Sequence, residues 1–404
     1  MQDANSIIAP SKQGVMLGFP PPPDKRVTAA NCYQPEHMAW RIQNTTRLFP
    51  SARISRGADS ISILPQGERL DIERLAVAAS DGTSLPMQEV LRRTSVDSMI
   101  VMHRGRVVYE GYFGDMTDSK VHAMYSCTKS VIGLLVEALI HEGTLDETRL
   151  ASAYVPELQA SPAGSATVRE LLDMRANFMF SEKPKIPGQV QVDYIMGLGF
   201  IPRPTDYSGP NGVYELLSGA KSMGSHGGMF RYDNGSTDTL GWILRKVTGQ
   251  ALDTLIGDLI WSQLGAERDA GMSIDASGVE WAAAGMSAIL RDFARLGETL
   301  RCHGAFNGRQ ILPSAVYQKI KMGGDRECFG DGGGGNMSGG SYRSQWWFYH
   351  DRFDSFACRG QYGQRLWIAP NAETLVAQFA VDSTLSALEP LRLSGFQAIA
   401  DSMA

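Results

Sequence analysis

One apolar stretch limits the folds open to this chain: residues 131–140, which follow Ser126 and Lys129. Apolar residues recur there at helical spacing, and Gly143 follows as a stop signal. The pattern predicts a buried helix with Ser126 and Lys129 on one face of its first turn. A lysine in a poorly solvated site is driven toward its neutral amine, which can take a proton from a neighbouring serine. We therefore interpret Ser126 and Lys129 as a candidate nucleophile and base.

The same spacing recurs in Ser218 and Lys221. A glycine-rich segment, 222–228, follows this second pair, and no apolar helix does. A solvated lysine near a helix is the simpler interpretation there.

Composition excludes several functional classes. With 404 residues, 43% of them hydrophobic, the chain can bury one large domain or two closely packed ones. The net charge of −5 comes without a basic run, so nucleic acid is not an expected partner. Five cysteines without paired spacing predict neither a disulfide framework nor a metal site. The start of the chain has no signal-peptide pattern, and no run of about 18 apolar residues occurs, so we expect a cytoplasmic protein outside the membrane.

The order of predicted elements indicates an α/β (α+β) fold. Residues 1–60 are rich in proline and loop signals and are expected to form an arm over a main domain, 61–404. Strands are predicted around 95–125, where Arg104 and Gly105 mark a hairpin, and again within 285–404, whereas the region 140–284 is mainly helix and loop. Within that region, Thr167 and Glu170 have capping-box spacing before a short helix, and apolar spacing predicts a helix at 251–264. We expect one mixed antiparallel sheet that both chain ends form, flanked by helices, with a mainly helical inserted subdomain.

A second pair of polar residues, Tyr232 and Asn234, precedes a predicted helix at 237–247. A phenol near a cationic lysine can have its pKa lowered and relay protons, and an amide can orient a substrate carbonyl or the lysine. On its own a Tyr-x-Asn sequence is most often a surface turn.

Three segments together resemble the motifs of serine β-lactamase-fold hydrolases: Ser126 to Lys129, Tyr232 to Asn234, and Gly360 to Gln364. The order and spacing are similar to class C β-lactamases, family VIII carboxylesterases and, more closely, 6-aminohexanoate-dimer (nylon oligomer) hydrolases. The resemblance covers roughly residues 90–400. It implies a β-lactamase/transpeptidase-like fold and a serine hydrolase acting on a small ester or linear amide.

Carried over residue by residue, the resemblance makes Ser126 the acylating nucleophile, Lys129 its proton acceptor and Tyr232 the residue that passes a proton to the leaving group. The backbone N–H groups of Ser126 and of Gln361, which is expected at the entry to a strand, would form the oxyanion hole. Asn234 would face the substrate. Further substrate-binding candidates are Tyr362 and Gly363 beside Gln361, and Asp193 and Tyr194 in the divergent loop 178–207.

The third motif departs from β-lactamases, which carry a cation there, whereas this chain has Tyr362. Tight β-lactam recognition is therefore not expected, and an ester is easier to accommodate than an aminohexanoate amide. The partners we expect are a small-molecule ester or amide substrate and, as an open option, a second copy of the chain.

Other functions stay open at this point. A non-catalytic penicillin-binding-like module, a β-lactamase or a D-amino peptidase would use the same fold. A metallohydrolase is disfavoured because the seven histidines are scattered without a His-Glu-x-x-His sequence, so no metal or cofactor is expected. A Gly-x-Ser-x-Gly elbow is also missing from the sequence.

Overall fold

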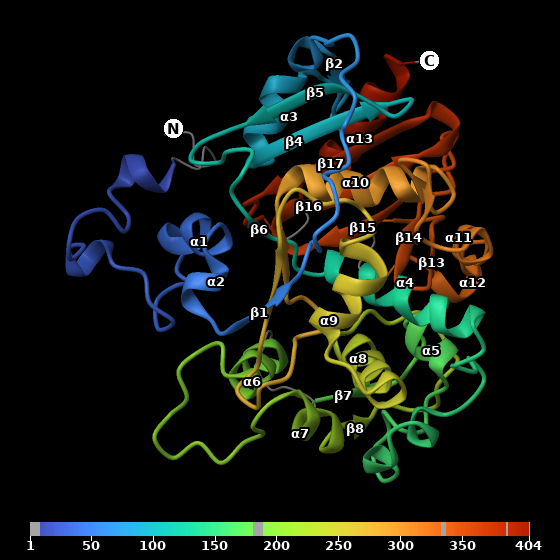
Figure 1. The fold of residues 1–404 in the computed structure, drawn as a ribbon. Coiled ribbons are helices and arrows are strands. Elements are labelled where there is room, and N and C mark those ends of the chain that lie inside the picture. Colours follow the sequence, from blue (N-terminus) through green and yellow to red (C-terminus); the bar gives the residue numbers. More distant parts are fainter. Residues whose placement is uncertain (1–8, 181–188, 333–336, 385–386, 404) are drawn as a thin grey trace.

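A seven-stranded antiparallel sheet forms one part of the molecule. The computed structural model describes residues 9–180, 189–332, 337–384 and 387–403. Its strands run in the order β13-β14-β15-β16-β17-β4-β5, and each pairing is antiparallel. Early strands thus lie beside late ones in the same sheet, which confirms the expected fold class (Figure 1). The strand bounds are β4 Val96–His103, β5 Arg106–Tyr112, β13 Ser341–Arg343, β14 Trp346–Phe348, β15 Phe356–Gly360, β16 Gln364–Ala369 and β17 Thr374–Ala380.

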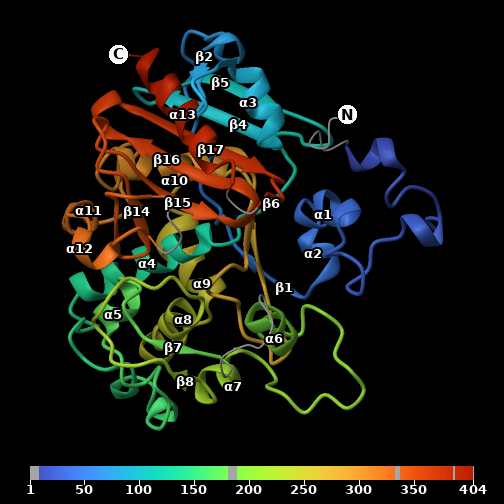
Figure 2. The same ribbon diagram turned by 180° about the vertical axis from the view of Figure 1, so that it is seen from behind.

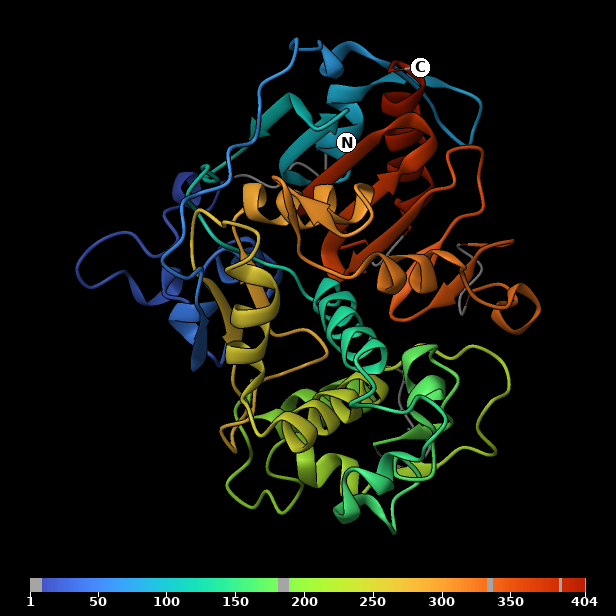
Figure 3. The ribbon, with the colours of Figure 1, turned by 45° about the vertical axis from the view of Figure 1, so that its right-hand side comes forward.

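Helices cover both faces of this sheet. Because successive residues of a strand point to opposite faces, Ile100 and Met102 of β4 join the core that contains α10, whereas Met99 and Val101 join the core that contains α13. Burial on both faces explains why β4 is a nearly continuous apolar run. Helix α4 lies between this sheet and the part of the molecule that contains α5 to α8 (Figure 3). The helix bounds are α1 Pro35–Ile42, α2 Thr45–Leu48, α3 Met87–Arg93, α4 Cys127–His141, α5 Val168–Leu172, α6 Gln189–Leu198, α7 Val213–Ser218, α8 Gly235–Thr248, α9 Leu252–Ile256, α10 Leu290–Arg301, α11 Ser314–Lys321, α12 Arg326–Phe329 and α13 Glu389–Asp401.

A second, four-stranded sheet leads the chain into α4. Its order is β1-β9-β10-β6, and Ala123 of β6 pairs with Ser287 of β10. The amide of Met124 then donates to the carbonyl of Met286 (2.8 Å), so the approach to Ser126 is held by sheet hydrogen bonds. This sheet was not predicted, and its first strand lies within the expected arm 1–60. The bounds are β1 Ser51–Ile54, β6 His122–Ala123, β9 Ala270–Ser273 and β10 Met286–Ala288, and the short strand pairs elsewhere are β2 Ala76–Ala78 with β3 Ser84–Pro86, β7 Phe178–Met179 with β8 Lys221–Ser222, and β11 Ala305–Phe306 with β12 Arg309–Gln310.

The strongest local sequence signals, a turn and a helix cap, are found in the structure where they were predicted. Arg104 and Gly105, both with positive φ, form the turn between β4 and β5. Thr167 caps α5, with its side chain accepting from the amide of Glu170 and the Glu170 carboxylate accepting in return. The helix predicted at 251–264 is instead broken: α9 is followed by a π-helical turn, Gly257–Trp261.

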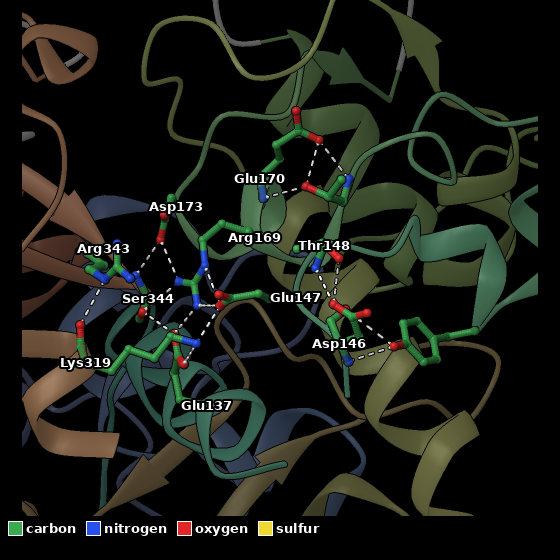
Figure 4. Close-up of polar contacts among 12 residues, drawn as sticks. Glu137, Asp146, Glu147, Thr148, Arg169, Glu170, Asp173, Lys319, Arg343 and Ser344 are labelled. Atoms are coloured by element: carbon green, nitrogen blue, oxygen red, sulfur yellow. Dashed lines mark hydrogen bonds and ion pairs between the residues drawn. The ribbon is translucent and has the colours of Figure 1, made fainter. Parts of the chain in front are cut away.

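A partly buried polar cluster, with Glu137 fully buried, anchors the middle of α4 (Figure 4). Arg169 of α5 pairs with Glu137 of α4 (2.8 Å), with Glu147, and with Asp173 (3.2 Å). Glu137 also accepts from the hydroxyl of Ser344, in the turn between β13 and β14. Helix α4, helix α5 and the turn between β13 and β14, which are far apart in sequence, are therefore joined at the middle of α4.

Among the residues that the structure describes, none of the helices combines the length and apolar character that a membrane span requires.

Candidate active site

Ser126 lies at the N-terminus of α4, and Lys129 lies one turn further on the same face. The Nζ atom of Lys129 is 3.1 Å from the Oγ atom of Ser126. Lys129 is 1% exposed, whereas Ser126 is half-buried and lines a cavity. Burial lowers the pKa of Lys129, which moves the amine toward its neutral form, although the charges of Asp238 and Asp233 oppose this. A neutral amine at this distance can accept the serine proton.

Two oxygen atoms hold the amine of Lys129 in place. The Nζ atom donates to Oδ1 of Asn234 (2.7 Å) and to the backbone carbonyl of Ala283 (2.8 Å). Asn234 therefore orients the lysine, one of the two roles predicted for it, while also lining the cavity.

A buried acidic residue that the sequence analysis missed lies behind this lysine. Asp238 of α8 accepts from the amide of Ala283 (3.0 Å) and from the hydroxyl of Tyr194 (2.5 Å), which in turn accepts from the indole N–H of Trp281 (2.6 Å). Burial raises the pKa of Asp238, whereas the Tyr194 hydrogen bond and the charge of Lys129 oppose the rise. The signal that could have identified Asp238 is an acidic residue on the apolar face of a predicted helix.

Tyr232 lies between Lys129 and an aromatic cluster. The Nζ atom of Lys129 is 5.1 Å from the centre of its ring, and the ring of Trp347 lies 5.2 Å away, centre to centre. We expected the lysine to lower the pKa of Tyr232. The structure shows the opposite, because burial raises the pKa of Tyr232 and a hydrogen bond with Ser126 offsets only part of the rise. The phenol therefore keeps its proton in the resting protein.

The third segment is a turn between β15 and β16, where a strand entry was expected. Residues Gln361–Gly363 form a short 3-10 turn in which Tyr362 has a φ of 63°. Gly360 lies so close to the segment before Ser126 that a Cβ atom there would be 2.4 Å from the carbonyl oxygen of Met124. The backbone of Gln361 is thus carried beside Ser126, and both residues line the cavity.

Gly363 was a candidate substrate-binding residue, but the structure places it away from the cavity. It is buried, does not belong to the described cavity wall, and has a φ of +95° that favours glycine. A Cβ atom there would lie 2.8 Å from Nη2 of Arg392. Its role is therefore to let the turn close.

Asp193 and Tyr194, the two substrate-binding candidates in the divergent segment 178–207, have different surroundings. Tyr194 lies on α6, where we had expected a loop; it is 2% exposed and is bonded to Asp238, with its edge on the cavity. Asp193 is outside the described cavity wall and accepts from the side chain of Gln189 on the same helix (2.7 Å). Residues 181–188 of this segment lie outside the described residues.

The alternative pair Ser218 and Lys221 has no comparable surroundings. Both residues are exposed, one at the end of α7 and the other in β8. This pair therefore lacks the burial that lowers the pKa of Lys129.

The cavity beside Ser126 has a volume of about 830 Å³. This lies within the range of small-molecule sites, and much of its wall is aromatic or aliphatic. Its described apolar wall residues include Phe49, Phe180, Ile195, Phe200, Ile201 and Trp281. The site therefore suits a substrate with an apolar chain next to its reacting carbonyl.

Sequence comparisons show which known proteins this chain is similar to. The β-lactamase family model matches residues 88–384. The 6-aminohexanoate-dimer hydrolase of Paenarthrobacter ureafaciens is 29% identical over 346 residues, 85% of each chain.

Solved structures show the same relationship. A structure titled "Putative 6-aminohexanoate-dimer hydrolase from Bacillus anthracis" is 31% identical with a TM-score of 0.87, over 95% of this chain and 98% of that one. The hydrolase EstCE1 shares the fold alone, at 18% identity with a TM-score of 0.61, over 78% of this chain and 96% of that one. The family match covers well over half of the sequence, so this chain belongs to the β-lactamase family of hydrolases.

Proposed function

We propose that this chain is a serine hydrolase that cleaves a linear amide through an acyl-enzyme on Ser126. The observation that carries the proposal is the contact between the buried amine of Lys129 and the Oγ atom of Ser126, at 3.1 Å. A linear amide is favoured because relatives named 6-aminohexanoate-dimer hydrolases match most of the chain. Small esters, which have a better leaving group, are expected to be cleaved as well.

The first half-reaction forms the acyl-enzyme. Oγ of Ser126 attacks the amide carbonyl carbon while Nζ of Lys129 takes the serine proton. The carbonyl oxygen becomes an oxyanion that the N–H groups of Ser126 and Gln361 stabilise. The C–N bond then breaks, and Tyr232 gives its proton to the leaving nitrogen while the proton on Lys129 replaces it.

The second half-reaction returns the free enzyme. Water attacks the Ser126 ester and its proton passes to the Tyr232 and Lys129 pair. The C–O bond to Ser126 then breaks while the pair returns that proton to Oγ of Ser126, which releases the carboxylic acid and restores the hydroxyl. The raised pKa of Tyr232 suits this assignment, because a phenol that keeps its proton can donate it to a departing amine.

The test compares Ser126→Ala with Ser218→Ala in the full chain. The parent protein should cleave the linear dimer of 6-aminohexanoate and a p-nitrophenyl ester, and intact-mass spectrometry should detect an acyl adduct on Ser126. Ser126→Ala should lose both activities and the adduct while its circular dichroism spectrum is unchanged. Ser218→Ala, which removes the exposed serine of the second pair, should retain both activities. Full turnover by Ser126→Ala would contradict the assignment, and ligand binding without turnover by the parent would favour a recognition module.

A further inference from the structure

A buried arginine from the N-terminal part of the chain shares the cavity with Ser126. Helix α1 lies on the flank of the molecule, near β6 (Figures 1 and 2), and its residue Arg41 is 4% exposed. Arg41 and Ser126 both line the cavity. Nothing in the reaction proposed above uses this arginine.

Three aromatic rings surround the guanidinium group of Arg41. Its central carbon lies 4.2 Å from the ring centre of Tyr33, 5.8 Å from that of Tyr125 and 5.7 Å from that of Tyr362. Tyr125 directly precedes Ser126, and Tyr362 directly follows Gln361. The arginine is therefore held close to both proposed oxyanion-hole segments.

The positive charge of Arg41 has no counter-ion in the described part of the chain. The groups that act on its charge are Tyr33, Tyr125, Tyr362 and Cys32. Burial raises the pKa of Tyr33 to about 12, with the charge and a hydrogen bond of Arg41 offsetting part of the rise, and burial also raises the pKa of Tyr125 and of Cys32. These three groups are uncharged at neutral pH, and no carboxylate of the described residues forms an ion pair with Arg41.

Two nitrogen atoms of Arg41 also lack hydrogen-bond partners. Nε and Nη2 are both buried, and neither has a partner among the described residues. These two atoms form one edge of the guanidinium plane, which presents a pair of parallel N–H groups and matches the two oxygens of a carboxylate. A buried cation that is left without such a partner is costly.

The other arginines of the cavity wall do have partners. Arg231 donates to the carbonyl of Phe178 (2.5 Å), and Arg359 and Arg365 both pair with Glu389. Among the arginines of the described wall, Arg41 alone has buried nitrogen atoms without a hydrogen-bond partner.

We propose that Arg41 binds a carboxylate group of the substrate. The inference rests on the proposed function and defines its substrate class: linear amides or esters that carry a free carboxylate, joined to the reacting amide or ester group by an apolar chain. Phe49 and Thr45, on the wall next to α1, and the apolar wall residues named above would lie along that chain. A neutral molecule of the same length leaves the Nε and Nη2 edge unpaired, so it binds more weakly.

The test measures binding without turnover, so that it does not depend on the proposed reaction. The protein is the full chain with Ser126→Ala, and the paired probes are 6-acetamidohexanoate and its neutral carboxamide. Titration calorimetry should show at least ten-fold tighter binding of the carboxylate, and the carboxylate should raise the melting temperature more at equal concentration. Adding Arg41→Met, which keeps the apolar stem, should abolish the difference.

A matched control uses another wall arginine. Arg359 also packs on an aromatic ring, with its central carbon 4.7 Å from the ring centre of Trp347, but it is paired with Glu389. Arg359→Met should therefore keep the preference for the carboxylate. If Arg41→Met fails to fold, Arg41→Gln replaces it.

Three outcomes would overturn the inference: equal affinity for the two probes, no binding of either, or a preference that survives the loss of Arg41. Loss of the preference in Arg359→Met alone would also contradict it. Failure of the proposed function is recognised separately, because the parent protein would then leave a neutral p-nitrophenyl ester uncleaved.

Discussion

Removing the charge of Asp238 should change the pH at which the enzyme becomes active. The carboxylate and the amine of Lys129 contact the two backbone polar groups of one residue, because Oδ1 accepts from the amide of Ala283 (3.0 Å) and Nζ donates to its carbonyl (2.8 Å). In the folded protein the negative charge of Asp238 raises the pKa of Lys129 and opposes the effect of burial. Asp238→Asn keeps the shape of the side chain and removes this charge.

The expected size of the shift follows from that geometry. Contact through the two ends of Ala283 places the charges roughly 6 Å apart. At an effective dielectric constant of about 20, their attraction is about 3 kcal/mol, which corresponds to about 2 pKa units. Since the proposed mechanism requires the neutral amine, activity should be lost as the pH falls through the pKa of Lys129. Removing the anion lowers that pKa, so the acid limb of the profile should move to lower pH by up to about 2 units.

The assay is kcat/KM for a p-nitrophenyl ester as a function of pH, with spontaneous hydrolysis subtracted. The parent enzyme should gain activity with rising pH and reach its plateau below the ordinary lysine pKa of ~10.4, because burial lowers the pKa of Lys129. Asp258→Asn, at an exposed position of the π-helical turn after α9, is the control and should leave the profile unchanged. An unshifted acid limb in Asp238→Asn would show that Asp238 is already neutral, and a shift to higher pH would refute the reasoning outright.

Two further predictions concern how α4 is held. Gly133→Ala should lower the free energy of unfolding by about 1–3 kcal/mol in urea denaturation, because its Cβ atom would lie 2.3 Å from the carbonyl oxygen of Ser344. Gly228→Ala, where nothing lies within 4 Å of the new Cβ atom, is its control, and equal stability of the two variants would contradict the argument. Glu137→Gln should cost about 3 kcal/mol, the low end for breaking a buried ion pair, because Arg169 keeps Glu147 and Asp173 as partners. An unchanged denaturation midpoint would show that the pair with Arg169 contributes no net stability.

Local sequence signals predicted the elements whose cause is itself local. The turn at Arg104 and Gly105 and the capping box at Thr167 and Glu170 each depend on residues a few positions apart, so their patterns are visible in the chain. The same holds for Ser126 and Lys129, whose shared helical face follows from the periodicity of α4.

Long-range pairings were not predictable in this way. Strands β1 and β9 are short and pair across more than half of the chain, and neither carries a strong strand pattern of its own. The break after α9 likewise went unrecognised, because the apolar spacing of 251–264 continues through the π-helical turn.

The sequence by itself identified the family and the candidate nucleophile and base, because these depend on short motifs in a given order. Only the tertiary structure decided which groups shift the pKa of Lys129 and which other side chains line the cavity. The segments that carry Asp238, Ala283 and Arg41 approach α4 from separate parts of the chain, and the charge that each group carries depends on its burial and its neighbours. Burial, which raises the pKa of Tyr232 where proximity to a lysine had suggested the opposite, likewise exists only in the folded protein.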